Sequence, residues 1–164
     1  MTVRRVLLGA VVVLTALLLQ GAVLSHLPLR ADLLLVVVIA FALAEGATSG
    51  AVTGFLTGLL VDTTADHELG RVALAYALAG HVAGLVPVRP DRPRVLPLVV
   101  TAAAAATAVT AYAVVGVLLS DPRVTLAGWG RATAATVVGC VVLAVLVVPL
   151  VSALVRRAGA DPLR

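Results

Sequence analysis

The residues best suited to chemistry lie together in one polar segment. Asp62 ends an apolar stretch, and Asp66, His67 and Glu68 follow after three intervening residues. Carboxylates and imidazoles are common metal ligands. Their spacing here matches no known ligand motif, such as the His-Glu-x-x-His helix. We therefore expect a solvated, helix-capping loop and no metal site.

Catalytic patterns are equally absent from the sequence. His81 lies in an apolar stretch with no intramembrane acid nearby in the sequence, which favours a hydrogen-bonded core histidine over a proton relay. The sequence has no Gly-x-Ser-x-Gly turn and no phosphate-binding loop. We expect a protein without enzymatic activity and without a cofactor.

The composition determines which class of protein must position these residues. The chain has 164 residues, of which 62% are hydrophobic and 12% charged, and its mean hydropathy is +1.15. Soluble domains are about 45–50% apolar and about 25% charged. This excess of apolar residues excludes a soluble globular enzyme and a disordered chain, and it predicts an integral membrane protein.

The charged residues and the cysteine limit which ligands and which covalent links the protein can have. All twelve basic residues are arginines, scattered singly or in small groups, so no basic stripe is available to bind nucleic acid. Cys140 is the only cysteine, which excludes an internal disulfide. The arginines are instead typical of topology signals beside membrane spans.

Apolar runs between the charges predict an all-α protein with one polytopic membrane domain over residues 1–164. A spanning helix needs about 20 apolar residues. We expect six spans, at about 6–27, 32–44, 46–61, 71–88, 95–119 and 130–155. The first run follows Arg4 and Arg5 and is longer than a signal-peptide core, which favours a retained helix over a cleaved signal.

The stretch 33–61 has two interpretations, because Glu45 and Gly46 interrupt it. It forms either one long broken helix or two short helices joined by a tight turn. Arginine placement favours the second, since six spans with both termini inside put eight arginines in the cytoplasm and four outside. Five spans with the same start put only five inside.

A glycine ridge is the most specific feature of the chain. Gly46, Gly50, Gly54 and Gly58 recur at every fourth residue and therefore share one helix face, where another backbone can approach closely. We expect packing inside the bundle, with Gly80 and Gly84 as the mate of the ridge; a surface for a partner helix is the alternative. We further expect interhelical hydrogen bonds from four polar residues within the spans: Gln20, Thr101, Thr107 and Thr110.

This region resembles MreD, the rod shape-determining membrane protein of bacteria. The resemblance rests on Gly50-x-x-x-Gly54-x-x-x-Gly58-Leu59-Leu60-x-Asp62, followed by Leu69-Gly70 and an apolar helix with Leu74. Chain length and span number are similar over the whole chain. The specific motif covers about residues 46–74.

The resemblance implies a non-catalytic part of the cell-elongation machinery in the bacterial cell membrane. It implies an MreC-like single-span partner, and beyond it MreB, a RodA-type glycosyltransferase and a class B penicillin-binding protein. It also implies a fold similar to the substrate-binding S components of energy-coupling-factor vitamin transporters. Such an S component is the alternative function, although few polar residues in the spans suit a vitamin.

Overall fold

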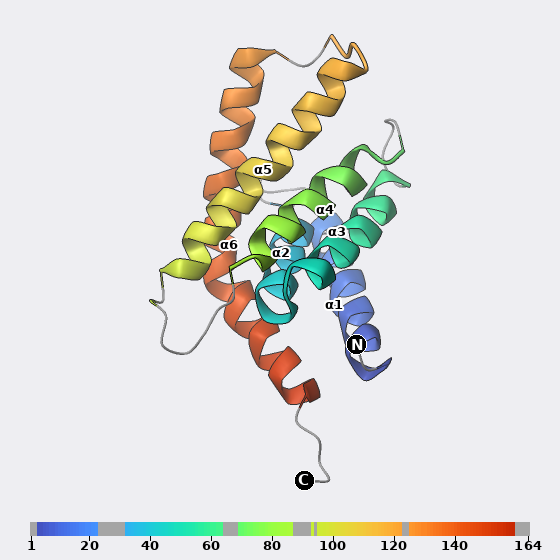
Figure 1. Cartoon of the computed structure of the whole chain (residues 1–164), viewed down its shortest axis with the longest axis vertical. Coiled ribbons are helices and arrows are strands. Elements are labelled where there is room, and N and C mark those ends of the chain that lie inside the picture. The colour runs from blue at the N-terminus through green and yellow to red at the C-terminus, as the bar shows by residue number, and fades with distance from the viewer. Residues whose placement is uncertain are drawn as a thin grey trace.

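The computed structural model describes residues 3–22, 32–63, 69–86, 93, 95–122 and 125–159, and these contain helices but no strands. Figure 1 shows their arrangement. The helices are α1 (Val3–Ala22), α2 (Leu33–Glu45), α3 (Ala47–Asp62), α4 (Arg71–Gly84), α5 (Leu96–Leu118) and α6 (Leu126–Gly159). The prediction of an all-α fold with six helices is confirmed.

Helix α2 forms the centre of the molecule. Its residues Leu33–Leu43 are all buried, and it contacts each of the other five helices. A helix that is apolar on every face must be covered on every face, and the uninterrupted run Leu33–Leu43 has this character. The carboxylate of Asp32 caps this helix by accepting a hydrogen bond from the Leu35 N–H at 3.1 Å.

The chain breaks between α2 and α3 at one residue. Gly46 has a φ of +94°, a conformation that favours glycine because it has no Cβ. Its N–H closes α2 on the Ala42 carbonyl at 2.8 Å. The stretch that had two interpretations therefore forms two short helices.

Helix length corrects the expectation of six full membrane spans. Only two described helices are long and apolar enough to cross a membrane, at Leu96–Leu118 and Leu126–Val155. Helices α2, α3 and α4 have 13, 16 and 14 residues. At 1.5 Å per residue they are about 20–24 Å long, short of a hydrocarbon core of about 30 Å. Gly46 divides one apolar run in two, and α4 ends at Gly84 instead of residue 88.

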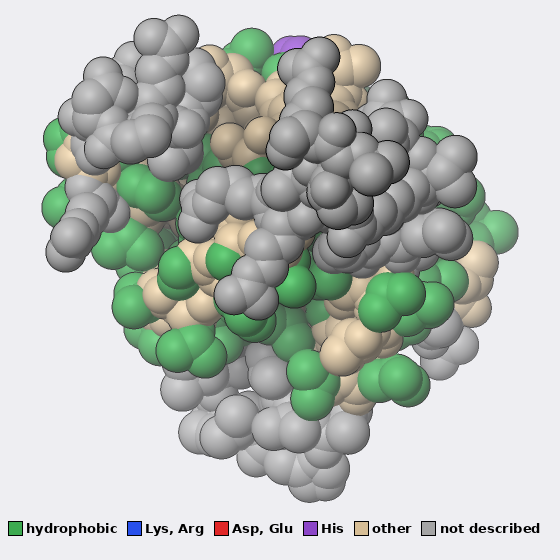
Figure 2. Space-filling view, turned by 90° about the horizontal axis from the view of Figure 1, so that it is seen from below, with side chains coloured by type: hydrophobic (Ala, Val, Ile, Leu, Met, Phe, Trp, Pro, Cys, Tyr) green, Lys and Arg blue, Asp and Glu red, His purple; other side chains and the backbone are tan. Residues whose placement is uncertain are grey.

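Helices α5 and α6 form a hairpin that extends beyond the other helices (Figure 1). Pro97 lies in the first turn of α5, where a missing N–H is harmless, and Pro149 lies inside α6. Figure 2 shows that the described side chains on one face of the molecule are mainly hydrophobic. Exposed apolar residues on both long helices suit a lipid environment.

Candidate functional site

The glycine ridge of α3 packs against α4. Gly50, Gly54 and Gly58 are buried, and a Cβ added to any of them would lie closer than 3.0 Å to backbone atoms of α4. For Gly58 the nearest atom is the Ala73 Cα, at 2.5 Å. Because backbone atoms cannot move aside as a flexible side chain does, this contact requires glycine on α3.

The second glycine pair completes the contact, as the sequence predicts. Gly80 faces Gly50, and Gly84 faces the junction of Gly46 and Ala47. A Cβ on Gly84 would lie 2.5 Å from the Ala47 Cα. The ridge therefore serves packing inside the bundle, and α3 and α4 lie side by side along their length (Figure 1).

Asp62 continues the four-residue spacing of the ridge and binds the beginning of α4. Its carboxylate accepts hydrogen bonds from the N–H groups of Gly70, Val72 and Ala73 at 2.9, 3.1 and 3.0 Å. The first N–H groups of a helix lack partners within the helix and carry partial positive charge. A carboxylate from the end of α3 thus accepts hydrogen bonds from N–H groups at the N-terminus of α4 that have no partner within that helix.

The expectation of a solvated capping loop is therefore wrong for Asp62 itself, whose side chain is only 1% exposed. It caps a helix, but from inside the protein, because Gly58 brings the end of α3 onto α4. Gly70, with a φ of +97°, turns the chain so that its own N–H reaches the carboxylate. Asp66, His67 and Glu68 lie outside the described residues.

A buried cation joins α4 to the end of α5. Arg71 is 4% exposed, and its Nη1 lies 2.9 Å from Oδ2 of Asp121. Its Nε donates to the Tyr112 carbonyl at 3.2 Å, and its guanidinium lies 3.9 Å from the centroid of the Tyr112 ring. Arg71 is thus paired, bonded and stacked, which offsets the cost of burying its charge.

A third polar cluster surrounds Asp32. The hydroxyl of Tyr76 donates to Oδ2 of Asp32, and Oε1 of Gln20 accepts from the Leu34 N–H at 3.0 Å. The Cys140 thiol lies 3.8 Å from the Asp32 carbonyl oxygen, and it is buried as a small core side chain. Four helices therefore meet at the beginning of α2.

This cluster opens into a cavity of about 420 Å³ to which all six helices contribute. Gln20, Asp32 and Tyr76 line it together with Tyr112 and Thr136. The remaining lining is aliphatic: Leu35, Val61, Val72, Ala75, Ala108, Val109 and Ala132. Its volume lies within the range of small-molecule sites, about 300–1,000 Å³.

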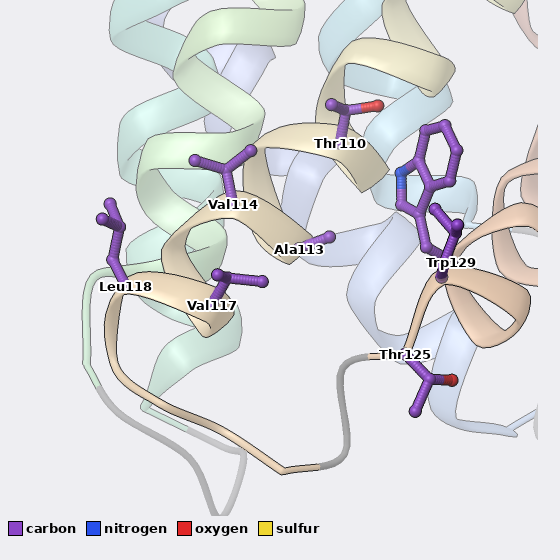
Figure 3. A pocket seen from close by; sticks show the side chains of 8 residues that line it. Thr110, Ala113, Val114, Val117, Leu118, Thr125 and Trp129 are labelled. Atoms are coloured by element: carbon purple, nitrogen blue, oxygen red, sulfur yellow. The ribbon is translucent and has the colours of Figure 1, made fainter.

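A second hollow lies between the end of α5 and the beginning of α6, and Figure 3 shows the Trp129 indole facing the α5 side chains across it. Its volume is about 450 Å³. The lining is mainly apolar: Thr110, Ala113, Val114, Val117, Leu118, Thr125, Leu126 and Trp129. None of its described lining residues carries a charge.

Several polar residues differ from expectation. His81 is exposed on α4 and is not a core histidine. Thr101 and Thr107 donate to the Pro97 and Ala103 carbonyls of their own helix, at 2.7 and 2.9 Å, so these bonds are not interhelical. A threonine hydroxyl reaches the carbonyl four residues back, and this local bond competes with contacts to other helices. Gln20 does link α1 to α2, as expected.

Sequence reasoning missed Asp32, Tyr76, Arg71 and Asp121 as interacting residues. The first two are 44 residues apart and the second two are 50 apart, so no local spacing connects them. One sequence signal for this pair was available. Arg71 directly precedes an apolar run, and a cation buried there needs an acidic partner.

The described residues hold no group of three or more potential metal ligands among His, Cys, Asp and Glu. Comparison with known proteins identifies no relative, since no family model, no curated protein and no solved structure matches this chain.

Proposed function

We propose that the chain is a non-catalytic membrane component of the bacterial cell-elongation complex, as its resemblance to MreD implies. One observation supports this most. The residues that carry the resemblance act together, since Gly50, Gly54 and Gly58 seat α3 on α4 and Asp62 binds the first turn of α4 through Gly70 and its neighbours. A motif whose residues share one structural task suits a structural scaffold better than a chance run of small residues.

The proposal places the chain in the bacterial cell membrane with both termini in the cytoplasm. Helices α5 and α6 have the length and hydropathy of membrane spans. The shorter helices α1, α3 and α4 pack around α2, whose residues Leu33–Leu43 are buried. In this arrangement all six helices lie in the bilayer, with the α3–α4 turn on the outer side.

Partner contacts then fall outside the glycine ridge, because α4 already covers it. Leu69 belongs to the resembling segment and is 72% exposed beside the Asp62 cap. We assign Leu69 and the exposed apolar faces of α5 and α6 to an MreC-like single-span protein. MreB, a RodA-type glycosyltransferase and a class B penicillin-binding protein would join through the same complex.

Depletion in the source organism tests this function. Loss of the chain should shorten and round the cells, and the wild-type chain should restore elongated growth. Leu69→Ala should restore it less well at equal protein level, whereas Leu78→Ala, at an exposed position on α4, is the matched control. Unchanged cell form after full depletion would contradict the proposal.

A vitamin-transporter S component is the second candidate, and the polar cavity around Asp32 favours it. S components bind their substrate within the helix bundle and work with an ATPase pair and a coupling protein. The two candidates differ in their partners, so recovery of an ATPase pair would replace the first proposal by the second.

A further inference from the structure

We propose that the cavity around Asp32 binds a small amphipathic molecule whose head group donates hydrogen bonds and is neutral or cationic. This site goes beyond the elongation function and does not depend on it. For the transporter alternative, it would define the class of substrate.

The polar wall of the cavity determines what the head group must offer. Asp32 accepts hydrogen bonds from the Tyr76 hydroxyl and the Leu35 N–H, and the Gln20 side chain and the Leu34 N–H also contribute to its hydrogen bonding. The Tyr76 hydroxyl oxygen and Oε1 of Gln20 each have a further acceptor position, so a ligand N–H or O–H can bind to either of them beside the carboxylate. Tyr76 and Gln20 also present a hydroxyl and an amide beside the carboxylate.

The charge of the lining selects against anions. Asp32 is the only carboxylate among the described lining residues, and none of them is basic. The guanidinium of Arg71, whose neighbour Val72 lines the cavity, lies against the Tyr112 ring and is paired with Asp121. An anionic head group would therefore lose its hydration in a largely apolar cavity whose described lining offers no cation to compensate its charge.

The rest of the cavity determines the body of the ligand. Aliphatic side chains from α3, α4 and α5 line it at Val61, Val72 and Val109, and Tyr112 adds an aromatic ring. Sites of this kind hold the apolar part of a ligand while a few polar groups orient it. At about 420 Å³, the space suits a compact ring system and is too small for a two-chain lipid.

Three probes with one shared ring test the proposal. These are 1-naphthylmethylamine, 1-naphthylmethanol and 1-naphthoate, which carry a cationic, a neutral and an anionic head group. Binding to the full chain in lipid nanodiscs is measured by equilibrium dialysis against empty nanodiscs of the same lipid. We expect saturable binding of the amine and the alcohol, and binding of the carboxylate at least about tenfold weaker.

Two variants localise the binding. Asp32→Asn keeps an acceptor for the Leu35 N–H, so α2 remains capped while the charge is lost, and we expect the amine to bind about tenfold more weakly. Ala132→Leu fills the cavity without removing a polar group and should abolish binding. Ala134→Leu, at an exposed position of the same helix, is the matched control and should bind as the wild type does.

Three results would overturn the proposed binding site. No saturable binding above empty nanodiscs, equal binding of all three probes, or unchanged binding by folded Ala132→Leu would each refute it. Because no partner protein takes part in this test, its failure would leave the elongation function standing.

Discussion

Gly54 packs so closely on Tyr76 that a methyl group on its Cα would lie 2.7 Å from the Tyr76 carbonyl carbon. The same residue of α4 that requires glycine on α3 also donates its hydroxyl to Asp32. The glycine ridge therefore helps to position a polar group of the cavity. Packing between α3 and α4 and the shape of the cavity are linked through Tyr76.

Replacement of Gly54 by leucine should destabilise the fold by about 3 kcal/mol, because the added atoms meet backbone that cannot repack. Equilibrium unfolding in detergent, followed by circular dichroism, measures the loss. Val52→Leu enlarges a side chain that is 53% exposed on the same helix and should leave stability nearly unchanged. Equal stability of the two variants would show that α3 does not pack on α4 in this way.

Asp62→Ala should cost about 2–3 kcal/mol of stability, since it removes a carboxylate that accepts three backbone N–H groups at the beginning of α4. Asp62→Asn retains one acceptor oxygen and should cost less. Amide hydrogen exchange at Val72 and Ala73 reports the effect locally and should accelerate in the alanine variant. Wild-type exchange rates in that variant would refute the capping role.

Arg71 and Asp121 should stabilise the fold as a pair. Arg71→Met or Asp121→Asn alone should each cost about 1–3 kcal/mol, because each removes a charged hydrogen bond from a pair whose arginine is buried. The double variant should lose clearly less than the sum of the two. A double-mutant cycle in detergent measures this coupling, and strictly additive losses would show that the pair does not interact.

Two engineered cysteines should test the proposal that all six helices lie in the bilayer, although only α5 and α6 have the length of full spans. In a Cys140→Ala background, Thr63→Cys should react with a membrane-impermeant maleimide outside the cell, whereas Val95→Cys should react only after permeabilisation. Both positions are exposed. If α5 and α6 were the only spans, residues 63 and 95 would both precede the first span and would lie on the same side.

The α3–α4 contact could be predicted from the sequence because the glycines that form it repeat at a regular spacing within each helix. Four glycines at four-residue spacing define a helix face, and Gly80 with Gly84 supplies a matching face on another helix. The break at Gly46 was also predictable as one of two interpretations. Only part of the role of Asp62 could be predicted. Its position in line with the glycines follows from the sequence, but its burial depends on how closely α3 approaches α4.

The cavity could not be predicted from local pattern. Asp32 and Tyr76 come together only when five other helices enclose α2, and most of the residues that line the cavity are aliphatic and give no local sequence signal. The bounds of α2 and α3 lie within one residue of the expected 32–44 and 46–61, whereas α4 ends at Gly84 and not at residue 88, because hydropathy marks an apolar run but does not show where a helix ends. Arg71 appeared as a topology signal, whereas the fold buries it against Asp121.

The central claim, membership of the elongation complex, is tested most directly by crosslinking in living cells. A tagged copy at native level is crosslinked in the membrane, purified, and its partners are identified by mass spectrometry, with an unrelated tagged membrane protein as the control. We predict recovery of an MreC-like single-span protein together with wall-synthesis enzymes. Recovery of an ATPase pair with a transmembrane coupling protein, and no elongation protein, would contradict the account.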